Sequence, residues 1–197
     1  MFNERNDNTI IINGSNADEN SRIVLHDSLG VSKVQLNSNY LNGGDARLIT
    51  DDLEINGGSD LAELFNITNH LSEIKPGYLV SIDPEQAGNL KISNEAYDNK
   101  LAGVISGANG IKPGIIMGQK GTLAHGDHNI TLSGRAYVKA NTTNGKIKVG
   151  DVLTSSDVPG EAMRATSNRK SEGAILGKAM TALEDESGFI LVLVLNQ

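Results

Sequence analysis

Few residues in this chain combine a chemically active type with a suggestive spacing, and the densest group is His125-Gly126-Asp127-His128. Imidazole nitrogens and carboxylate oxygens are common ligands of zinc and other transition metals. The two His are three positions apart, rather than four as in a helical zinc site, and no Glu lies between them to act as a base. A Gly-Asp pair is also typical of a tight turn between strands.

We favour the turn, as a hairpin between strands near Leu123 and Ile130, and expect no metal and no cofactor in a single chain. One alternative stays open, because three copies of one His on a symmetry axis would form a metal site from one residue per chain. Loops on a rigid β scaffold commonly carry recognition, and Asn141–Gly145 is a second such turn. The candidate binding residues are therefore His125, Asp127, His128, Asn141 and Asn144.

Two acidic clusters invite a glycosidase or calcium interpretation: Asp51-Asp52 with Glu54, and Glu184-Asp185-Glu186. A glycosidase needs two carboxyl groups about 5–10 Å apart across a cleft, and usually aromatic platforms for the sugar. This chain has no Trp and four Tyr, and neither cluster matches the twelve-residue calcium loop. We interpret the second cluster as a polar turn before the last strand.

Nucleophilic catalysis has equally little support. The four His residues (26, 70, 125 and 128) and many Ser make a coincidental Ser/His/Asp set easy to draw, but no G-x-S-x-G or phosphate-binding glycine loop is present. The absence of Cys excludes thiolate catalysis, disulfides and Cys-based zinc sites. We therefore expect no catalytic residues and no enzyme activity.

The composition of the chain predicts which secondary structure surrounds these residues. Hydrophobic residues make up 38% of the 197 residues and aromatics 4%, while Gly occurs 22 times and Asn 21 times. So many turn formers and so few large apolar side chains predict an all-β chain of short strands rather than a helical bundle. The net charge of −7 argues against binding to a phosphate backbone, so we expect no nucleic-acid partner.

No segment predicts insertion into a membrane. The longest apolar run, Phe189 to Leu195, has seven residues, whereas a membrane helix needs about 20. The first residues, MFNERNDNTIIING, do not show the basic and apolar regions of a secretory signal. We expect synthesis in the cytoplasm, followed by release or by assembly into a larger particle.

Residues 1–58 form a first region of short apolar bursts separated by Asn/Gly turns, such as Asp27–Gly30. Alternation in Arg22–Asp27 and Ser32–Asn37 predicts strands with one buried face. One copy buries too little apolar surface to offset its ordering entropy, so we prefer self-association to disorder. The predicted oligomerisation residues are Ile10, Ile12, Ile23, Leu25, Val34, Leu36 and Leu48.

Residues 59–73 are the one plausible helical linker. Ser59 or Asp60 could cap it, and Leu61, Leu64 and Phe65 follow at helical spacing. Residues 74–197 should form a compact β-barrel or β-clip-like domain with a core of branched aliphatics. Its last strand, Phe189–Leu195, is nearly continuous apolar sequence and is predicted to be central and covered on both faces.

This second region contains a weak internal repeat. Ile74–Ser81 matches Ile147–Thr154 at an offset of 73, and Leu101–Ile105 resembles Ile175–Ala179 at an offset of 74. Each copy has a Lys-x-Gly turn, a strand, a second strand and a third strand that carries a Gly. We infer two three-stranded units related by a pseudo-twofold axis. A third Lys-x-Gly turn, Lys112–Gly114, opens another strand between them.

Six segments of the second region follow one another in an order that can be compared with known families: Gly57–Phe65, Lys75–Asp83, Tyr97–Ser106, Ser133–Lys139, Lys148–Leu153 and Ala174–Ala179. Over residues 57–197 this order resembles the β-rich C-terminal domain at the ends of phage tail fibres, neck appendages and related bacterial surface fibres. Some of those domains are described as peptidase G2-type self-cleaving chaperones. The strands of residues 1–58 resemble the intertwined trimeric stem that precedes such domains.

The resemblance implies a homotrimeric, non-enzymatic virion or surface-fibre protein with an adhesin-like role in host attachment. Its partners would be other particle components or a cell-surface glycan or protein receptor. Two alternatives stay open: a self-cleaving chaperone tip, with a cut near Ser59-Asp60, and a tailspike hydrolase acting on polysaccharide. No cleavage dyad matches residue by residue, and aromatic poverty puts the hydrolase last.

Overall fold

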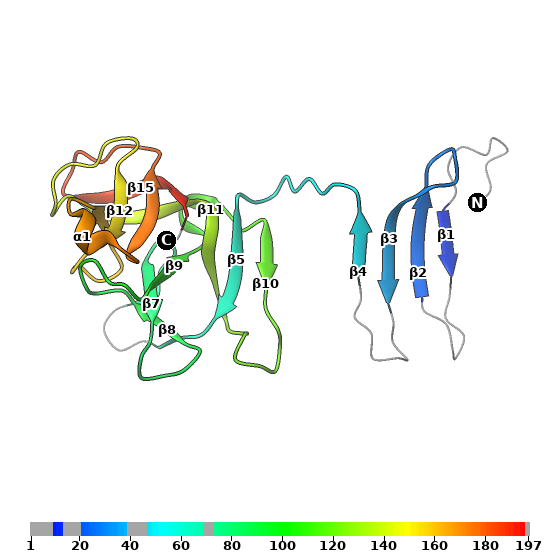
Figure 1. Ribbon diagram of the computed structural model, residues 1–197, viewed down its shortest axis with the longest axis horizontal. Coiled ribbons are helices and arrows are strands. Elements are labelled where there is room, and N and C mark those ends of the chain that lie inside the picture. The colour runs from blue at the N-terminus through cyan, green and yellow to red at the C-terminus, as the bar shows by residue number, and fades with distance from the viewer. Residues whose placement is uncertain (1–9, 14–20, 39–46, 69–72, 196–197) are drawn as a thin grey trace. The chain divides into compact units, whose positions relative to one another are not determined.

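The structure is a computed structural model, and it describes residues 10–13, 21–38, 47–68 and 73–195 (Figure 1). Strands make up 45% of it and helices 4%, so the prediction of an all-β protein is confirmed. The chain divides into two compact units, residues 1–54 and 55–197. The described helices are short: the 3-10 turn η1 (Ala108–Gly110) and α1 (Asn168–Ser171).

The first unit contains an antiparallel sheet in the order β1-β2-β3-β4. Asp27 shapes the turn between β2 and β3, because its Oδ1 accepts hydrogen bonds from the backbone N–H groups of Leu29 and Val31, both at 2.9 Å. Gly30 completes the turn with a positive φ of 76°. The four strands are β1 (Ile10–Asn13), β2 (Ser21–His26), β3 (Ser32–Ser38) and β4 (Arg47–Thr50).

Register places the seven predicted oligomerisation positions on one face of this sheet. One row across the strands pairs Ile12, Ile23, Leu36 and Leu48, and the next pairs Ile10, Leu25, Val34 and Thr50. Directly paired residues share a face, and neighbours along a strand alternate between faces. The side chains of Ile10 and Ile12 are not described, and these two residues are assigned to this face by their backbone pairing alone.

The second unit contains a closed five-stranded barrel. Its strands pair in the ring β11-β15-β14-β12-β13, and a parallel pairing of Ala140 with Ala162 returns from β13 to β11. The barrel part of the fold prediction is therefore confirmed. The strands are β11 (His128–Asn141), β12 (Val152–Ser155), β13 (Ala162–Arg164), β14 (Ile175–Ala179) and β15 (Ser187–Val194).

A second ring of pairings shares β11 with the first. It runs from β11 to β9, β7 and β8, and returns through β6 and the adjoining β5. Both β9 and β5 pair with the first half of β11, β5 along His128–Gly134. Its strands are β5 (Asp60–Phe65), β6 (Ile67–Thr68), β7 (Leu79–Ile82), β8 (Leu90–Ile92) and β9 (Leu101–Ile105). A further strand, β10 (Ile115–Met117), adds to β5 in parallel.

The unit with β7 and β9 and the unit with β12 and β14 share their register irregularities, in agreement with the internal repeat of two similar three-stranded units. The pairing β7-β9 is interrupted between Val80 and Ser81, and β12-β14 is interrupted at the equivalent step between Leu153 and Thr154. Opposite these irregularities lie Gly103 and Gly177, each paired at the same place in its ring. Register irregularities that recur at the offsets of 73 and 74 residues support a duplicated unit more strongly than a shared turn motif does.

Branched aliphatics fill the interior of this unit, as expected from its composition. One cluster includes Leu153, Leu176, Ile190 and Val192, and a second consists of Val80, Leu90, Ile92, Ile105 and Ile130. Leu79 and Val104 belong to the first cluster although their strands β7 and β9 belong to the second ring. The β7-β9 pair is thus covered on both faces, and it joins the two rings into one body.

The predicted helical linker over 59–73 is wrong wherever the structure describes it, because residues 60–65 and 67–68 are strands. The helical spacing of Leu61, Leu64 and Phe65 is overridden by pairing, since β5 lies between β10 and β11 (Figure 1). Residues 69–72 lie outside the described residues. The candidate cap Asp60 is instead buried, and its Oδ2 accepts hydrogen bonds from Ser106 and Thr131.

The last strand also differs from its prediction. In β15, Ile190, Val192 and Val194 are fully buried, whereas Phe189 and Leu193 are 43% and 38% exposed. The strand is central in the pairing order, but only its inner face is covered, because no described layer packs on the outside of the barrel. A continuous apolar run is therefore not covered on both sides here.

Candidate functional site

The loop before β11 is a crossover and not the predicted hairpin. Because β10 and β11 pair with opposite edges of β5, residues 118–127 must cross the end of that strand. Gly126 lies at the crossing, where a Cβ would come 2.0 Å from the carbonyl carbon of Phe65. The absence of a side chain at Gly126 therefore allows the backbone of this loop to lie in close contact with the backbone at Phe65.

The histidines of this loop do not converge with acidic groups. His125 is half-buried, Asp127 is exposed, and His128 begins β11 opposite Phe65. In the described part of the chain, no three side chains of His, Asp or Glu are grouped closely enough to hold a metal ion. The Nδ1 of His125 is buried without a described hydrogen-bond partner. His70 lies outside the described residues.

Asn141 must be corrected as a candidate for an exposed binding side chain, because it is 5% exposed. Its Nδ2 donates to Ser156 Oγ at 2.9 Å and to Glu161 Oε2 at 3.0 Å, and its Oδ1 accepts from the backbone of Thr143 at 3.1 Å. Ser187 Oγ donates to the other Glu161 oxygen at 3.0 Å. The amide thus satisfies buried polar groups where the barrel closes.

Asn144 joins the two rings through Tyr97. The Asn144 Nδ2 donates to the Tyr97 hydroxyl and to the Arg164 carbonyl, both at 3.1 Å. The Tyr97 hydroxyl also accepts from the backbone N–H of Thr166 at 3.0 Å. Tyr97 has a positive φ of 58°, an unfavourable conformation for a bulky residue that its surroundings must maintain.

We expect Tyr97→Phe to lower the free energy of unfolding by about 1–3 kcal/mol, because two donors lose their common acceptor. Urea denaturation measures the change. Tyr78→Phe is the matched control, since the Tyr78 hydroxyl has no hydrogen bond among the described residues, and it should change stability much less. Equal losses in the two variants would contradict the role of Tyr97 in joining the rings.

Asp98, the residue after Tyr97, is a buried carboxylate that also lies where the two rings meet. Its Oδ1 lies 2.8 Å from Lys100 Nζ and accepts from the Lys100 backbone at 2.9 Å, while Ser155 Oγ accepts from the Asp98 backbone at 2.8 Å. Burial acts to raise the pKa of Asp98, but the hydrogen bonds and the positive charge of Lys100 outweigh it and hold the pKa below its ordinary value of 3.8.

This lowered pKa predicts a dependence of stability on pH. The Asp98 carboxylate stabilises the fold above pH 3.8, and that contribution disappears as the pH falls through the lower, folded-state pKa. The stability difference between the protein and Asp98→Asn should therefore shrink as urea denaturation is moved from neutral pH to below that range. Glu184→Gln is the control, because Lys146 also lowers the pKa of Glu184 but that pair is exposed.

The acidic clusters have structural positions. Asp51 forms an exposed ion pair with Lys33 at 3.1 Å, and Glu184 pairs with Lys146. Asp52 Oδ1 accepts a hydrogen bond from the backbone of Leu53. Residues 184–186 precede β15, so the interpretation as a polar turn before the last strand is confirmed.

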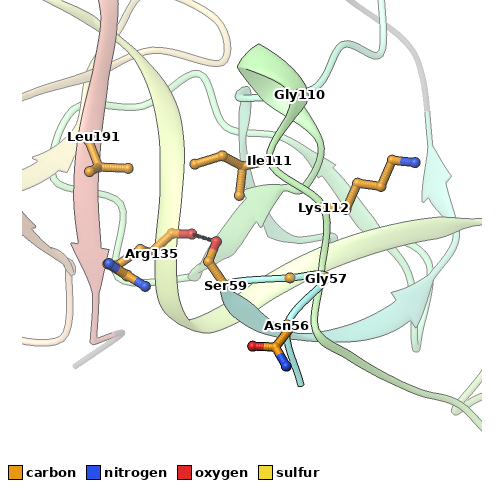
Figure 2. A pocket seen from close by; sticks show the side chains of 9 residues that line it. Asn56, Gly57, Ser59, Gly110, Ile111, Lys112, Arg135 and Leu191 are labelled. Carbon is orange, nitrogen blue, oxygen red and sulfur yellow. Dashed lines mark hydrogen bonds between the residues drawn. The ribbon is translucent and has the colours of Figure 1, made fainter. Parts of the chain in front are cut away.

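A pocket that no sequence pattern indicates lies at the beginning of β5 (Figure 2). Its volume is about 320 Å³, and it lies between Asn56–Ser59, Gly110–Lys112 and the outer side chains Arg135 and Leu191. Ser59 Oγ donates to the Arg135 carbonyl at 2.8 Å, and Arg135 N donates to the Ser59 carbonyl at 3.0 Å. These bonds hold the two main chains together beneath the pocket. Four separate segments form it, so no local motif could have indicated it.

Fold and site together define an all-β protein with a closed five-stranded barrel, a second set of strands that shares β11 with it, and an N-terminal sheet. No protein-family model matches the chain, and no curated protein matches it. Within the described residues, no helix has the length and apolar character required to traverse a membrane.

Proposed function

We propose that this protein is a structural, non-enzymatic component of a fibre or tail-like particle. Its N-terminal sheet would assemble with other copies, and its fused barrels would form a tip that attaches to a cell surface or to another particle component. Virion location, attachment and three-fold assembly follow from the resemblance of residues 57–197 to fibre-end domains and of residues 1–58 to a trimeric stem.

One observation carries the proposal: an apolar row on the N-terminal sheet faces solvent. Ile23, Leu25, Leu36 and Leu48 are 37%, 38%, 47% and 51% exposed, although they share one face. An antiparallel sheet usually packs one face on a core, and a contiguous apolar patch marks an interaction site. The opposite face includes Val24, which is 5% exposed, and Ile49, which is 49% exposed, so the larger set of exposed apolar side chains lies on the face that carries Leu36.

A second copy of the same sheet fits this face best. Burying a Leu or Ile side chain contributes about 1.5–3 kcal/mol, and every copy would contribute the same set. Symmetric assembly repeats one favourable contact without requiring a second gene product. The chain has no Cys, so disulfides cannot substitute for this burial.

Ser59 and Asp60, where a self-cleaving relative would be cut, have hydrogen bonds within the folded unit. The Ser59 hydroxyl donates to the Arg135 carbonyl, and the Asp60 carboxylate accepts from Ser106 and Thr131. These contacts account for the Ser59 hydroxyl and for Oδ2 of Asp60, while Oδ1 of Asp60 is buried without a described partner. The contacts favour the non-cleaving form of the proposal.

Light scattering of the purified full-length chain tests the proposal. We expect a mass three times the 20.9 kDa of one chain, at micromolar concentration and in moderate salt. A mass of one chain would overturn assembly through the N-terminal sheet, and a closed dimer would overturn the three-fold form. Denaturing gels of the same sample should show one full-length band, whereas a fragment cut near residue 59 would favour the chaperone alternative.

A further inference from the structure

The outer face of the barrel carries several cations along β14, β15 and β11, although the chain as a whole is acidic. Register aligns Lys178, Leu193 and Arg135 across three strands, and Leu191 is paired with Tyr137 in the next row. Lys139 lies beside Phe189, with its Nζ 5.6 Å from the ring centre. These paired positions thus carry three cations and no carboxylate, whereas the net charge of the chain is −7.

The pocket at the beginning of β5 opens at the edge of this face, because Arg135 and Leu191 belong to both. Figure 2 shows Arg135, Ile111 and Leu191 around one hollow, with the Lys112 side chain directed to the other side of its loop. Arg135 is exposed, and its guanidinium has no hydrogen bond or ion pair with any described residue. One free cation therefore borders the pocket.

The chemistry of the lining fits a ring that carries both hydroxyl groups and a carboxylate. The planar fork of an Arg matches a carboxylate in a bidentate pair. Gly57 and Gly110 have no atom within 4 Å of the place of a Cβ, and Asn56 adds a side-chain amide, so ligand hydroxyl groups can find polar partners there. Ile111 and Leu191 supply apolar contact for the C–H surface of a ring.

Size and neighbouring charge narrow the ligand class. A volume of about 320 Å³ lies at the lower end of small-molecule sites, which suits one sugar unit better than a peptide helix or a lipid chain. Lys139 and Lys178 lie on the face outside the pocket, where further carboxylates of a polymer could bind. A repeating acidic polymer matches this arrangement of one pocket and flanking cations.

We propose that this pocket binds a carboxylate-bearing unit of an acidic polysaccharide, with Arg135 paired to the carboxylate. The inference deepens the attachment role in the proposed function and rests on it. Arg135 is a binding residue in this scheme, and Lys139 and Lys178 strengthen the binding of longer chains by electrostatic attraction.

Titration of the full-length protein with glucuronic acid and with glucose, followed by ligand-observed NMR, tests the proposal. We expect millimolar binding of the acid and at least about tenfold weaker binding of glucose, because one bidentate ion pair distinguishes them. Arg135→Met should weaken binding of the acid by about tenfold, whereas Arg135→Lys should retain part of it. Arg169→Met is the matched control, since Arg169 is an exposed Arg on α1 away from the pocket lining, and it should bind as the unaltered protein does.

An oligoglucuronate should bind more tightly than the monosaccharide, and added salt should reduce that advantage. Equal binding of acid and glucose, unchanged binding by Arg135→Met, or no binding of either sugar would each overturn the proposal. Circular dichroism of each variant shows whether it is folded. If Arg135→Met does not fold, the proposal is tested by the binding of Arg135→Lys and by the comparison of glucuronic acid with glucose. Light scattering of the same samples separates the two proposals, since a monomer that binds glucuronic acid overturns only the assembly.

Discussion

Replacing Leu36 by lysine is expected to leave the protein monomeric. Leu36 lies in the middle of the apolar row, paired with Ile23 on one side and Leu48 on the other, and it is 47% exposed in one chain. Its burial in an assembly would contribute about 1.5–3 kcal/mol per chain. A lysine there loses this contribution and would place an unpaired ammonium in an apolar interface, which costs several kcal/mol more.

Leu29→Lys is the matched control for this substitution. Leu29 lies in the turn between β2 and β3 and is 86% exposed, so the same change of side chain adds the same charge away from the apolar row. Light scattering at equal concentrations should show the assembled mass for Leu29→Lys and one chain for Leu36→Lys. If Leu36→Lys remains assembled, the row is not the interface and another surface must hold the copies together.

Replacing Gly177 by alanine is expected to destabilise the barrel by about 3 kcal/mol, a large effect for one methyl group. An alanine Cβ at this position would lie 2.0 Å from the Leu193 carbonyl oxygen, so backbone must move in a central pairing of the barrel. The equivalent Gly103 would place its Cβ 2.5 Å from the Thr131 carbonyl oxygen. Gly103→Ala should therefore show a similar, somewhat smaller effect.

Gly57→Ala provides the comparison, because no atom lies within 4 Å of a Cβ at that position and its φ is not positive. We expect a change within about 0.5 kcal/mol, as at ordinary surface positions. Thermal and urea denaturation of the three variants measure these differences. Equal stability of Gly177→Ala and Gly57→Ala would contradict the close approach of β14 and β15.

Much of the fold is predictable from local pattern. Alternation locates β2 and β3, Asn/Gly clusters locate turns such as Asp27–Gly30, and the duplicated Lys-x-Gly segments locate both copies of the repeat. These features depend on backbone geometry and on residues close in the chain. The same alternation also places Ile23, Leu25 and Leu36 on one face, because register preserves the period of two.

The sequence-based predictions are wrong where contacts between residues far apart in the chain determine the local structure. Residues 60–65 have an apolar spacing compatible with a helix, yet the available edges of β10 and β11 make them a strand. Asn141 is turned inward because Ser156 and Glu161 accept its amide hydrogens. Outer residues of β15 stay exposed because nothing described covers that side of the barrel.

Composition and periods of a few residues are enough to predict a β protein, the position of most of its strands and turns, a duplicated unit, and the alternation that puts Ile23, Leu25 and Leu36 on one face. Three other properties become visible only in the folded chain: β11 belongs to two rings, Asp60 and Asn141 are internal, and Arg135 borders a pocket. Ring closure joins segments tens of residues apart, and those contacts depend on the packing of the whole unit, which no local period encodes.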